Sequence, residues 1–312
     1  MRAILPIGLF AAFAAVGAGG CWRTNVYAVT DESPSDAALD QQDDAESVSC
    51  PSPALAAGDT TVTLQVGTLS RTFVLHVPAA YDGKAPAPLV LDFHGIGSSG
   101  ASEASLSPYP AMTDPEGVLM AFPDGFKGPV GTAWNVGPCC VADVDDVAFA
   151  RAVVAYVQKV GCVDRARVYA VGVLTGGGMA HYLACRAADV FAAVAPAAFD
   201  LLQDNVNSCA PSRPITVVNF RGTADPRVPY AGGASSLVPG MGITFLGAQA
   251  SFAKWAQIDG CTGSPSKEDS NGCSTYASCQ GGVEVVLCTK DGGRDDPGDA
   301  TLGWPVLKRH HL

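Results

Sequence analysis

The order of apolar and polar positions along the chain predicts a sheet whose strands alternate with helices. Residues 61–66 and 71–77 alternate apolar and polar side chains around a glycine-containing connection, which indicates an antiparallel hairpin. Residues 88–93 and 118–122 are unbroken apolar runs followed by turn residues, as in buried parallel strands. Further strands are expected at 167–171, 191–194, 215–220 and 283–287, and helices at 145–160, 247–258 and 299–308, with another helix ending at Cys185.

A leading hairpin followed by alternating strands and helices predicts an α/β fold, in which a mainly parallel sheet carries helices on both faces. Neither an internal repeat nor a second domain is visible in the sequence. Ligands of such folds bind at the carboxyl ends of the strands. Four segments would meet there: His94-Gly95, Leu174, Asp225 and Gly292-Gly293.

The segment 168–185 is the most informative part of the chain. A β-branched strand runs into a glycine-rich turn and then into an amphipathic helix, the layout of a nucleophile elbow, Gly-x-Ser-x-Gly. The frame here is Gly172-Val-Leu-Thr-Gly176, so Leu174 stands where the serine belongs, and leucine has no group that a base could activate. Thr175 comes one position later, where its side chain is expected to point away from the apex. An ordinary strand-turn-helix crossover is the alternative interpretation.

Composition restricts the partners. A net charge of −11 argues against nucleic acid and against anionic membrane surfaces. Residues 22–57 are acidic and rich in Ser, Pro, Ala and Gln, which predicts a flexible linker before a domain at 58–312.

The N-terminus has the features of an export signal over residues 1–21. Arg2 precedes an apolar run at 3–16, and Ala18-Gly-Gly-Cys21 resembles a lipoprotein box in which Cys21 is lipidated. We therefore expect an exported protein, either secreted or held at the cell envelope by a lipid anchor as its only membrane contact. Ordinary signal cleavage near Ala18 is the alternative.

Ten cysteines remain after Cys21, an even number that predicts disulfides in an exported chain. Two of Cys162, Cys185 and Cys209 should pair at one edge of the sheet. The spacing shows no zinc signature, and the acidic loop 291–299 lacks the spacing of a calcium loop, so neither a metal nor a cofactor is expected. A C-terminal cluster contains Cys261, Cys273, Cys279 and Cys288.

From about residue 60 to 310 the chain resembles the secreted esterases grouped as feruloyl esterases, acetylxylan esterases and polyhydroxybutyrate depolymerases. The resemblance implies an α/β-hydrolase fold. It rests on the segments 89–95, 117–125, 139–140 with 144–149, 172–176, and 221–226 with 228–230.

The resemblance also implies a catalytic triad, which this chain lacks in part. The serine matches Leu174, the acid matches Asp225, and the histidine of a Gly-Gly-His loop matches Arg294. A second alignment of the histidine, onto Leu302, also gives no histidine. Backbone N–H groups of Ile96 and Thr175 would form the oxyanion hole. Arg221 stands where the family often has a further histidine.

Arg294 would face Asp225 in a static ion pair, because arginine stays protonated and cannot serve as a base. Of the five histidines, His94 is expected to orient backbone, and His181 is expected to be either packed or on the surface. His310 and His311 end the chain, where fraying is common.

Three functions remain open. The first is a non-hydrolytic, esterase-like surface lipoprotein that binds a protein partner or a ligand such as a plant cell-wall ester, a polyester or a carbohydrate. The second is an active carboxylic-ester hydrolase with a non-standard nucleophile or base. The third is a structural envelope protein without a ligand.

Overall fold

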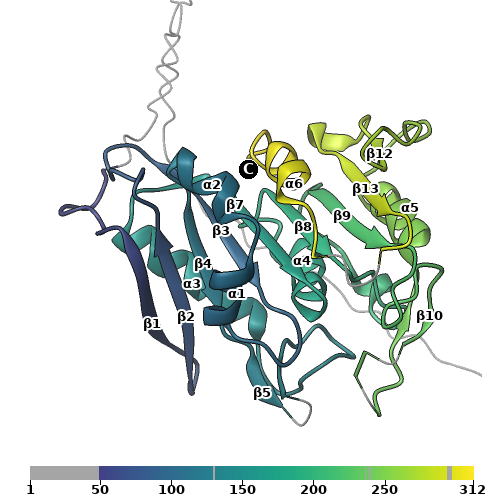
Figure 1. The fold of residues 1–312 in the computed structure, drawn as a ribbon, viewed down its shortest axis with the longest axis horizontal. Helices are drawn as coiled ribbons and strands as arrows, with labels where there is room; N and C mark the ends of the chain where they lie inside the picture. The colour runs from purple at the N-terminus through teal and green to yellow at the C-terminus, as the bar shows by residue number, and fades with distance from the viewer. Residues whose placement is uncertain (1–48, 129–130, 236, 239, 294–296) are drawn as a thin grey trace, which may run out of the picture. The chain divides into compact units, whose positions relative to one another are not determined.

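The computed structural model describes residues 49–128, 131–235, 237–238, 240–293 and 297–312 (Figure 1). They belong to one compact unit, Ser47–Leu312. The main sheet has nine strands within these residues. Their order across the sheet is β1 (Gly58–Val66), β2 (Leu69–Val77), β4 (Leu119–Pro123), β3 (Ala87–Phe93), β7 (Val163–Val173), β8 (Ala193–Ala197), β9 (Thr216–Gly222), β13 (Val285–Lys290) and β12 (Cys273–Tyr276).

The six strands from β4 to β13 run parallel, whereas β1, β2 and β12 pair antiparallel at the two edges. This confirms the predicted α/β fold with its leading hairpin. The strand β12 was not predicted, nor were two small hairpins that lie outside the main sheet. These hairpins are β5 (Phe126–Gly128) with β6 (Gly131–Ala133), and β10 (Gly233–Ala234) with β11 (Thr244–Phe245).

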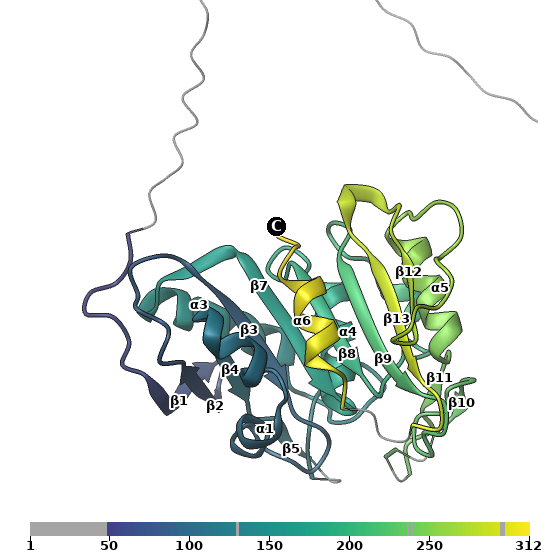
Figure 2. The ribbon, with the colours of Figure 1, turned by 45° about the horizontal axis from the view of Figure 1, so that its top comes forward.

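Helices cover both faces, because neighbouring residues of each strand point to opposite sides. On one face, Phe93 packs in a core with residues of α3 (Asp146–Val160), α4 (Thr175–Arg186) and α5 (Ala248–Ile258). On the other, Val90 packs in a second core with residues of α2 (Pro110–Thr113) and α6 (Ala300–Leu307), beside α1 (Gly100–Leu106) (Figure 1, Figure 2). Short 3₁₀ helices occupy Asp114–Glu116, Val206–Ser208 and Gln280–Gly282.

Aspartate side chains cap the N-termini of two helices. Asp145 accepts a hydrogen bond from Ala148 N at 2.8 Å and caps α3, as the sequence predicted. Asp299 accepts one from Thr301 N at 2.8 Å and caps α6. The helix α1 was missed, since its seven residues are too few to show a helical pattern.

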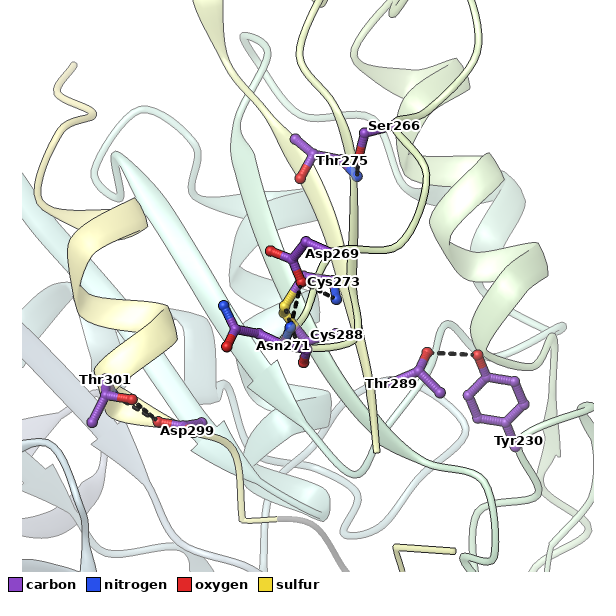
Figure 3. Close-up of a disulfide and its surroundings, with 10 residues drawn as sticks. All are labelled: Tyr230, Ser266, Asp269, Asn271, Cys273, Thr275, Cys288, Thr289, Asp299 and Thr301. Atoms are coloured by element: carbon purple, nitrogen blue, oxygen red, sulfur yellow. Dashed lines mark hydrogen bonds between the residues drawn. A yellow bond between two sulfur atoms is a disulfide. The ribbon is translucent and has the colours of Figure 1, made fainter. Parts of the chain in front are cut away.

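All ten cysteines in the part of the chain that the structure describes form disulfides. Cys185 pairs with Cys209, as expected of two of the three cysteines at that edge, while Cys162 pairs with Cys50. Five disulfides are typical of a protein that folds in an oxidising compartment, which supports export. The other pairs are Cys139–Cys140, Cys261–Cys279 and Cys273–Cys288 (Figure 3).

The predicted signal, Cys21 and most of the predicted linker lie outside the described residues, so the division at residues 21 and 57 stays a prediction. The Cys50–Cys162 bridge ties the last part of that linker to the domain. Among the described helices, none has the length and apolar character needed to cross a membrane.

Candidate active site

The turn between β7 and α4 has the geometry of an elbow. Leu174 alone separates the last residue of the strand from the first of the helix, and its φ of 52° and ψ of −121° are rare for a residue with a Cβ atom. The flanking glycines are sterically required. A Cβ at Gly176 would lie 1.8 Å from Phe93 O, and one at Gly172 would lie 2.6 Å from Gly176 O. The predicted strand, turn and helix are therefore all present.

The apex of the elbow is apolar. Leu174 is half-buried and leans on the loop after β3, because a Cβ built at Gly95 would lie 3.3 Å from Leu174 Cδ1. Thr175 is fully buried, and its hydroxyl has no hydrogen-bond partner among the described residues. The hydroxyl next to the apex is thus turned into the protein, away from the apex, as the sequence predicted.

His94 holds the backbone of this loop. Its Nδ1 donates to Gly95 O at 2.7 Å and its Nε2 accepts from Gly125 N at 2.8 Å, which fixes the neutral tautomer. Trp134 Nε1 donates to His94 O at 2.9 Å. Burial lowers the pKa of His94, which agrees with a neutral ring. Both ring nitrogens are used, so His94 orients backbone, as expected.

The amides of Ile96 and Thr175 were expected to form an oxyanion hole. Within the described residues, neither amide donates to a backbone or side-chain acceptor. Thr175 opens the twelve-residue helix α4, where the helix dipole favours negative charge. Both amides are available to an oxyanion, although their role stays a prediction.

Asp225 is held by an arginine. Its Oδ1 accepts from the amides of Arg227 and Val228 at 2.8 and 2.9 Å. Its Oδ2 lies 3.2 Å from Nη1 of Arg221, and neither side chain is exposed to solvent. The carboxylate therefore has partners on both oxygens without any histidine.

Arg221 links this acid to a second carboxylate. Its Nε lies 3.1 Å from Asp200 Oδ2, and its Nη2 donates to Val228 O at 2.6 Å. Burial raises the pKa of Asp200 to about 6, although the Arg221 charge opposes that rise. Sequence analysis identified Arg221 only as a departure from the family pattern. The arginine expected beside Asp225, Arg294, lies outside the described residues.

The remaining histidines offer no base at the elbow. His181 is buried, and its Nδ1 accepts from Trp255 Nε1 at 3.1 Å. Burial lowers the pKa of His181 to about 3, so this packed ring is neutral, as expected. His76, on the leading hairpin, contacts Asp59 of the same hairpin and Asp114 of the short 3₁₀ helix before β4.

The C-terminal histidines lie near the start of β7, at the end of the sheet opposite the elbow. Leu312 N donates to Ala166 O at 3.0 Å, near the start of β7, whereas Leu174 follows its end. The eight residue steps from Ala166 to Leu174 along the strand span about 26 Å. His310 and His311 are therefore too far away to reach the elbow.

Comparison with known proteins identifies relatives of this chain. No model of a protein family matches it. Feruloyl esterase B of Piromyces equi is 44% identical over 245 residues, which is 78% of this chain and 46% of that protein. Feruloyl esterase C of Emericella nidulans is 29% identical over 238 residues, 72% of this chain and 76% of that protein.

Solved structures agree on the fold. The acetyl xylan esterase from Aspergillus awamori has a TM-score of 0.58 at 14% identity, covering 80% of this chain and 98% of that one. A thermostable esterase has a TM-score of 0.53 at 15% identity, covering 81% of this chain and 63% of that one. The chain belongs to the α/β-hydrolase esterases. It spans about half the length of Feruloyl esterase B.

In this esterase fold, the segments predicted to meet do so at the carboxyl edge of the sheet. Gly293 O accepts from Ala224 N at 2.9 Å, directly before Asp225. A Cβ at Gly298 would lie 3.2 Å from the Cβ of Ala197, whose carbonyl accepts from Leu174 N at 3.0 Å. The two described ends of the loop that would carry the esterase histidine thus lie beside the acid and beside a neighbour of the apex.

A cleft of about 460 Å³ opens beyond β9, against residues 297–299. Phe220, Cys288 and Leu302 give it apolar surface, the turn 270–272 forms one wall, and 297–299 forms the other. The Cys273–Cys288 bridge and an Asp269 side chain that accepts from Asn271 N and Cys273 N hold the turn (Figure 3). The Asn271 amide points from the turn toward α6 (Figure 3).

Metal ligands do not gather in the described residues, where no three or more His, Cys, Asp or Glu side chains form a group that could hold an ion. Two acidic residues of the loop 291–299, Asp295 and Asp296, lie outside those residues.

Proposed function

We propose that this esterase-family protein binds an ester or a carboxylic acid at the elbow without hydrolysing it. The observation that carries the proposal is Leu174 at the apex. Acyl transfer needs a nucleophile activated by an adjacent base. The apex offers a methyl group, the hydroxyl of Thr175 is buried, and none of the histidines is free at the site.

Two features of the elbow support binding: its backbone amides and the N-terminus of α4. The amides of Ile96 and Thr175 could still donate to a carbonyl or carboxylate oxygen, and the N-terminus of α4 favours its negative charge. The relatives named for feruloyl and acetyl xylan esters suggest hydroxycinnamate and acetyl esters as the first ligands to test. The cleft beside Gly298 has a mixed polar and apolar lining, which suits the carbohydrate part of such an ester.

Calorimetry and an ester assay on the same sample test both halves of the proposal. Methyl ferulate and ferulate should bind with measurable heat, while methyl ferulate is recovered intact after hours at the same concentrations. Thr175→Pro removes one amide donor and should weaken binding at least tenfold. Gln249→Pro is the matched control, because Gln249 lies in the first turn of α5 and its amide likewise has no acceptor among the described residues. Absence of binding would leave a purely structural role. Release of ferulate would leave the alternative, an active hydrolase.

Placement at the cell envelope is part of the same proposal. The five disulfides support an exported domain, and the Cys21 motif supports a lipid anchor preceded by a cleaved signal. An anchored, non-hydrolytic domain could hold a cell-wall ester or a partner protein close to the surface.

A further inference from the structure

Two carboxyl groups face a small cavity behind the elbow, on the sheet face covered by α1 and α6. Asp92 lies near the end of β3 and is 3% exposed, and Glu103 lies in α1. The cavity they share measures about 10 Å³, enough for one water molecule. Gly172 of the elbow strand and Gly298 also line it.

Within the described ranges, neither carboxyl has a cation for a partner. Asp92 Oδ2 accepts from Ser107 Oγ at 2.5 Å, and no Lys, Arg or His in the described residues pairs with Asp92 or Glu103. The other titratable groups around them are acids or a phenol: Tyr109 before α2, Asp299 at the start of α6, and Asp124, which accepts from Gly100 N at the start of α1. The wall formed by β7 and β8 contains only Gly172, Val173, Ala195 and Ala197.

Two ionised carboxylates in such a place would be costly, because Asp92 is buried, Glu103 is half-buried, and no cation among the described residues compensates them. Burial raises the pKa of Asp92 to about 7. Burial, followed by the nearby Asp92 charge, raises the pKa of Glu103 to about 8. Raised pKa values of this kind favour a state in which one of the two groups keeps a proton at neutral pH.

We propose that Asp92 and Glu103 share a proton that clamps α1 onto the back of the elbow, and that loss of this proton releases α1. Asp92 is fixed in a central strand. Glu103 sits on a seven-residue helix whose Leu106 is 78% exposed, so α1 is the element that can move away when both groups carry charge. Because Gly172 and Gly298 share the cavity, release also reaches the elbow strand and the segment before α6. The proposal does not depend on what the elbow binds.

Thermal unfolding of the full chain between pH 4 and pH 9 tests the shared proton. Folded-state pKa values above the unfolded ones mean that the folded protein keeps protons the unfolded chain has lost. Stability should therefore fall as pH rises from about 4 to about 8 and then level off. Asp92→Asn and Glu103→Gln should flatten this fall and unfold several degrees higher than the natural chain at pH 8, about 3 °C or more. Asp204→Asn, an exposed carboxyl, should keep the natural profile.

Hydrogen exchange tests the movement. With intrinsic rates corrected for pH, protection of residues 100–106 should fall at least tenfold between pH 6 and pH 8.5 in the natural chain. It should stay constant in Glu103→Gln. The proposal is overturned if both variants follow the natural profile, if protection in α1 is independent of pH, or if carboxyl NMR finds both groups titrating near pH 4.

Discussion

Leu174 has the backbone angles of an elbow and an aliphatic side chain at its apex. A positive φ of this kind costs a residue with a Cβ atom about 1–3 kcal/mol, and glycine avoids that cost. We therefore predict that Leu174→Gly is more stable than Leu174→Ala by about 1 kcal/mol, the reverse of the order in helix interiors. Urea unfolding of the two variants measures the difference. A more stable alanine variant would show that the apex is relaxed.

Arg221 forms ion pairs with two buried acids, Asp200 and Asp225. Arg221→Met would leave Asp200 and Asp225 without their cation, and we expect a loss of about 3–5 kcal/mol in the free energy of unfolding. Arg151→Met, which breaks an exposed pair with Asp189, should cost less than about 1 kcal/mol. Similar losses in the two variants would refute the special position of Arg221.

At the scale of elements, the end of α6 is fastened to the start of β13. Glu284 Oε2 lies 2.7 Å from Arg309 Nη2, and Glu284 Oε1 lies 3.2 Å from His310 Nε2. The His310 hydrogen bond, helped by Arg309, lowers the pKa of Glu284 to about 2. A folded-state pKa below the unfolded one gives stability that is present above about pH 4.5 and is lost as pH falls toward 2.

Glu284→Gln should therefore lower the unfolding temperature at pH 6. The variant should also lose less of its unfolding temperature than the natural chain does as the pH falls from 5 to 2. Glu268→Gln, an exposed residue of the loop before β12, should leave the curve unchanged. Identical curves for Glu284→Gln and the natural chain would show that the contacts of Glu284 with Arg309 and His310 do not stabilise the folded state.

The strands and helices that the sequence predicted are those whose patterns are local. Buried runs such as 88–93 and the Asp145 cap need only neighbouring residues to be recognised. The four-residue strand β12 depends on its pairing with β13 and on the Cys273–Cys288 bridge, and neither is visible along the chain.

The same limit applies to the site. The elbow and the role of His94 follow from contiguous motifs, and the structure confirms both. The partner of Asp225 depends on how the strand end at Arg221 folds against Asp200, a contact with no periodic signal in the sequence. From the sequence alone, Arg294 was therefore the predicted partner of Asp225.

At the scale of the whole molecule, anchoring can be separated from folding. Cys21→Ser should move the protein from the membrane fraction to the soluble envelope fraction with an unchanged unfolding temperature, because Cys21 lies outside the disulfide-bonded domain. Fractionation followed by thiol titration of the unfolded, unreduced protein measures both properties. Unchanged membrane retention would rule out the lipid anchor, and abundant free thiols would contradict an oxidised domain.

Restoring the family residues should show how many changes silence the site. Leu174→Ser alone should recover little activity, because no base would activate the hydroxyl. Leu174→Ser with Arg294→His could restore a nucleophile and base acting as a unit. Adding Arg221→His should raise the rate further by freeing Asp225 from its arginine. Equal rates for the double and triple variants would show that Arg221 does not restrain the acid.

The most direct test of a silent elbow is turnover of 4-nitrophenyl acetate by the natural chain, with labelling by a serine-directed fluorophosphonate on the same preparation. We predict hydrolysis at the rate of buffer alone and no label, because the apex lacks a nucleophile and the site lacks a base. Rapid turnover by the natural chain that disappears in Thr175→Ala, His310→Ala or His311→Ala would contradict this, and would mean that the site has been rewired for hydrolysis.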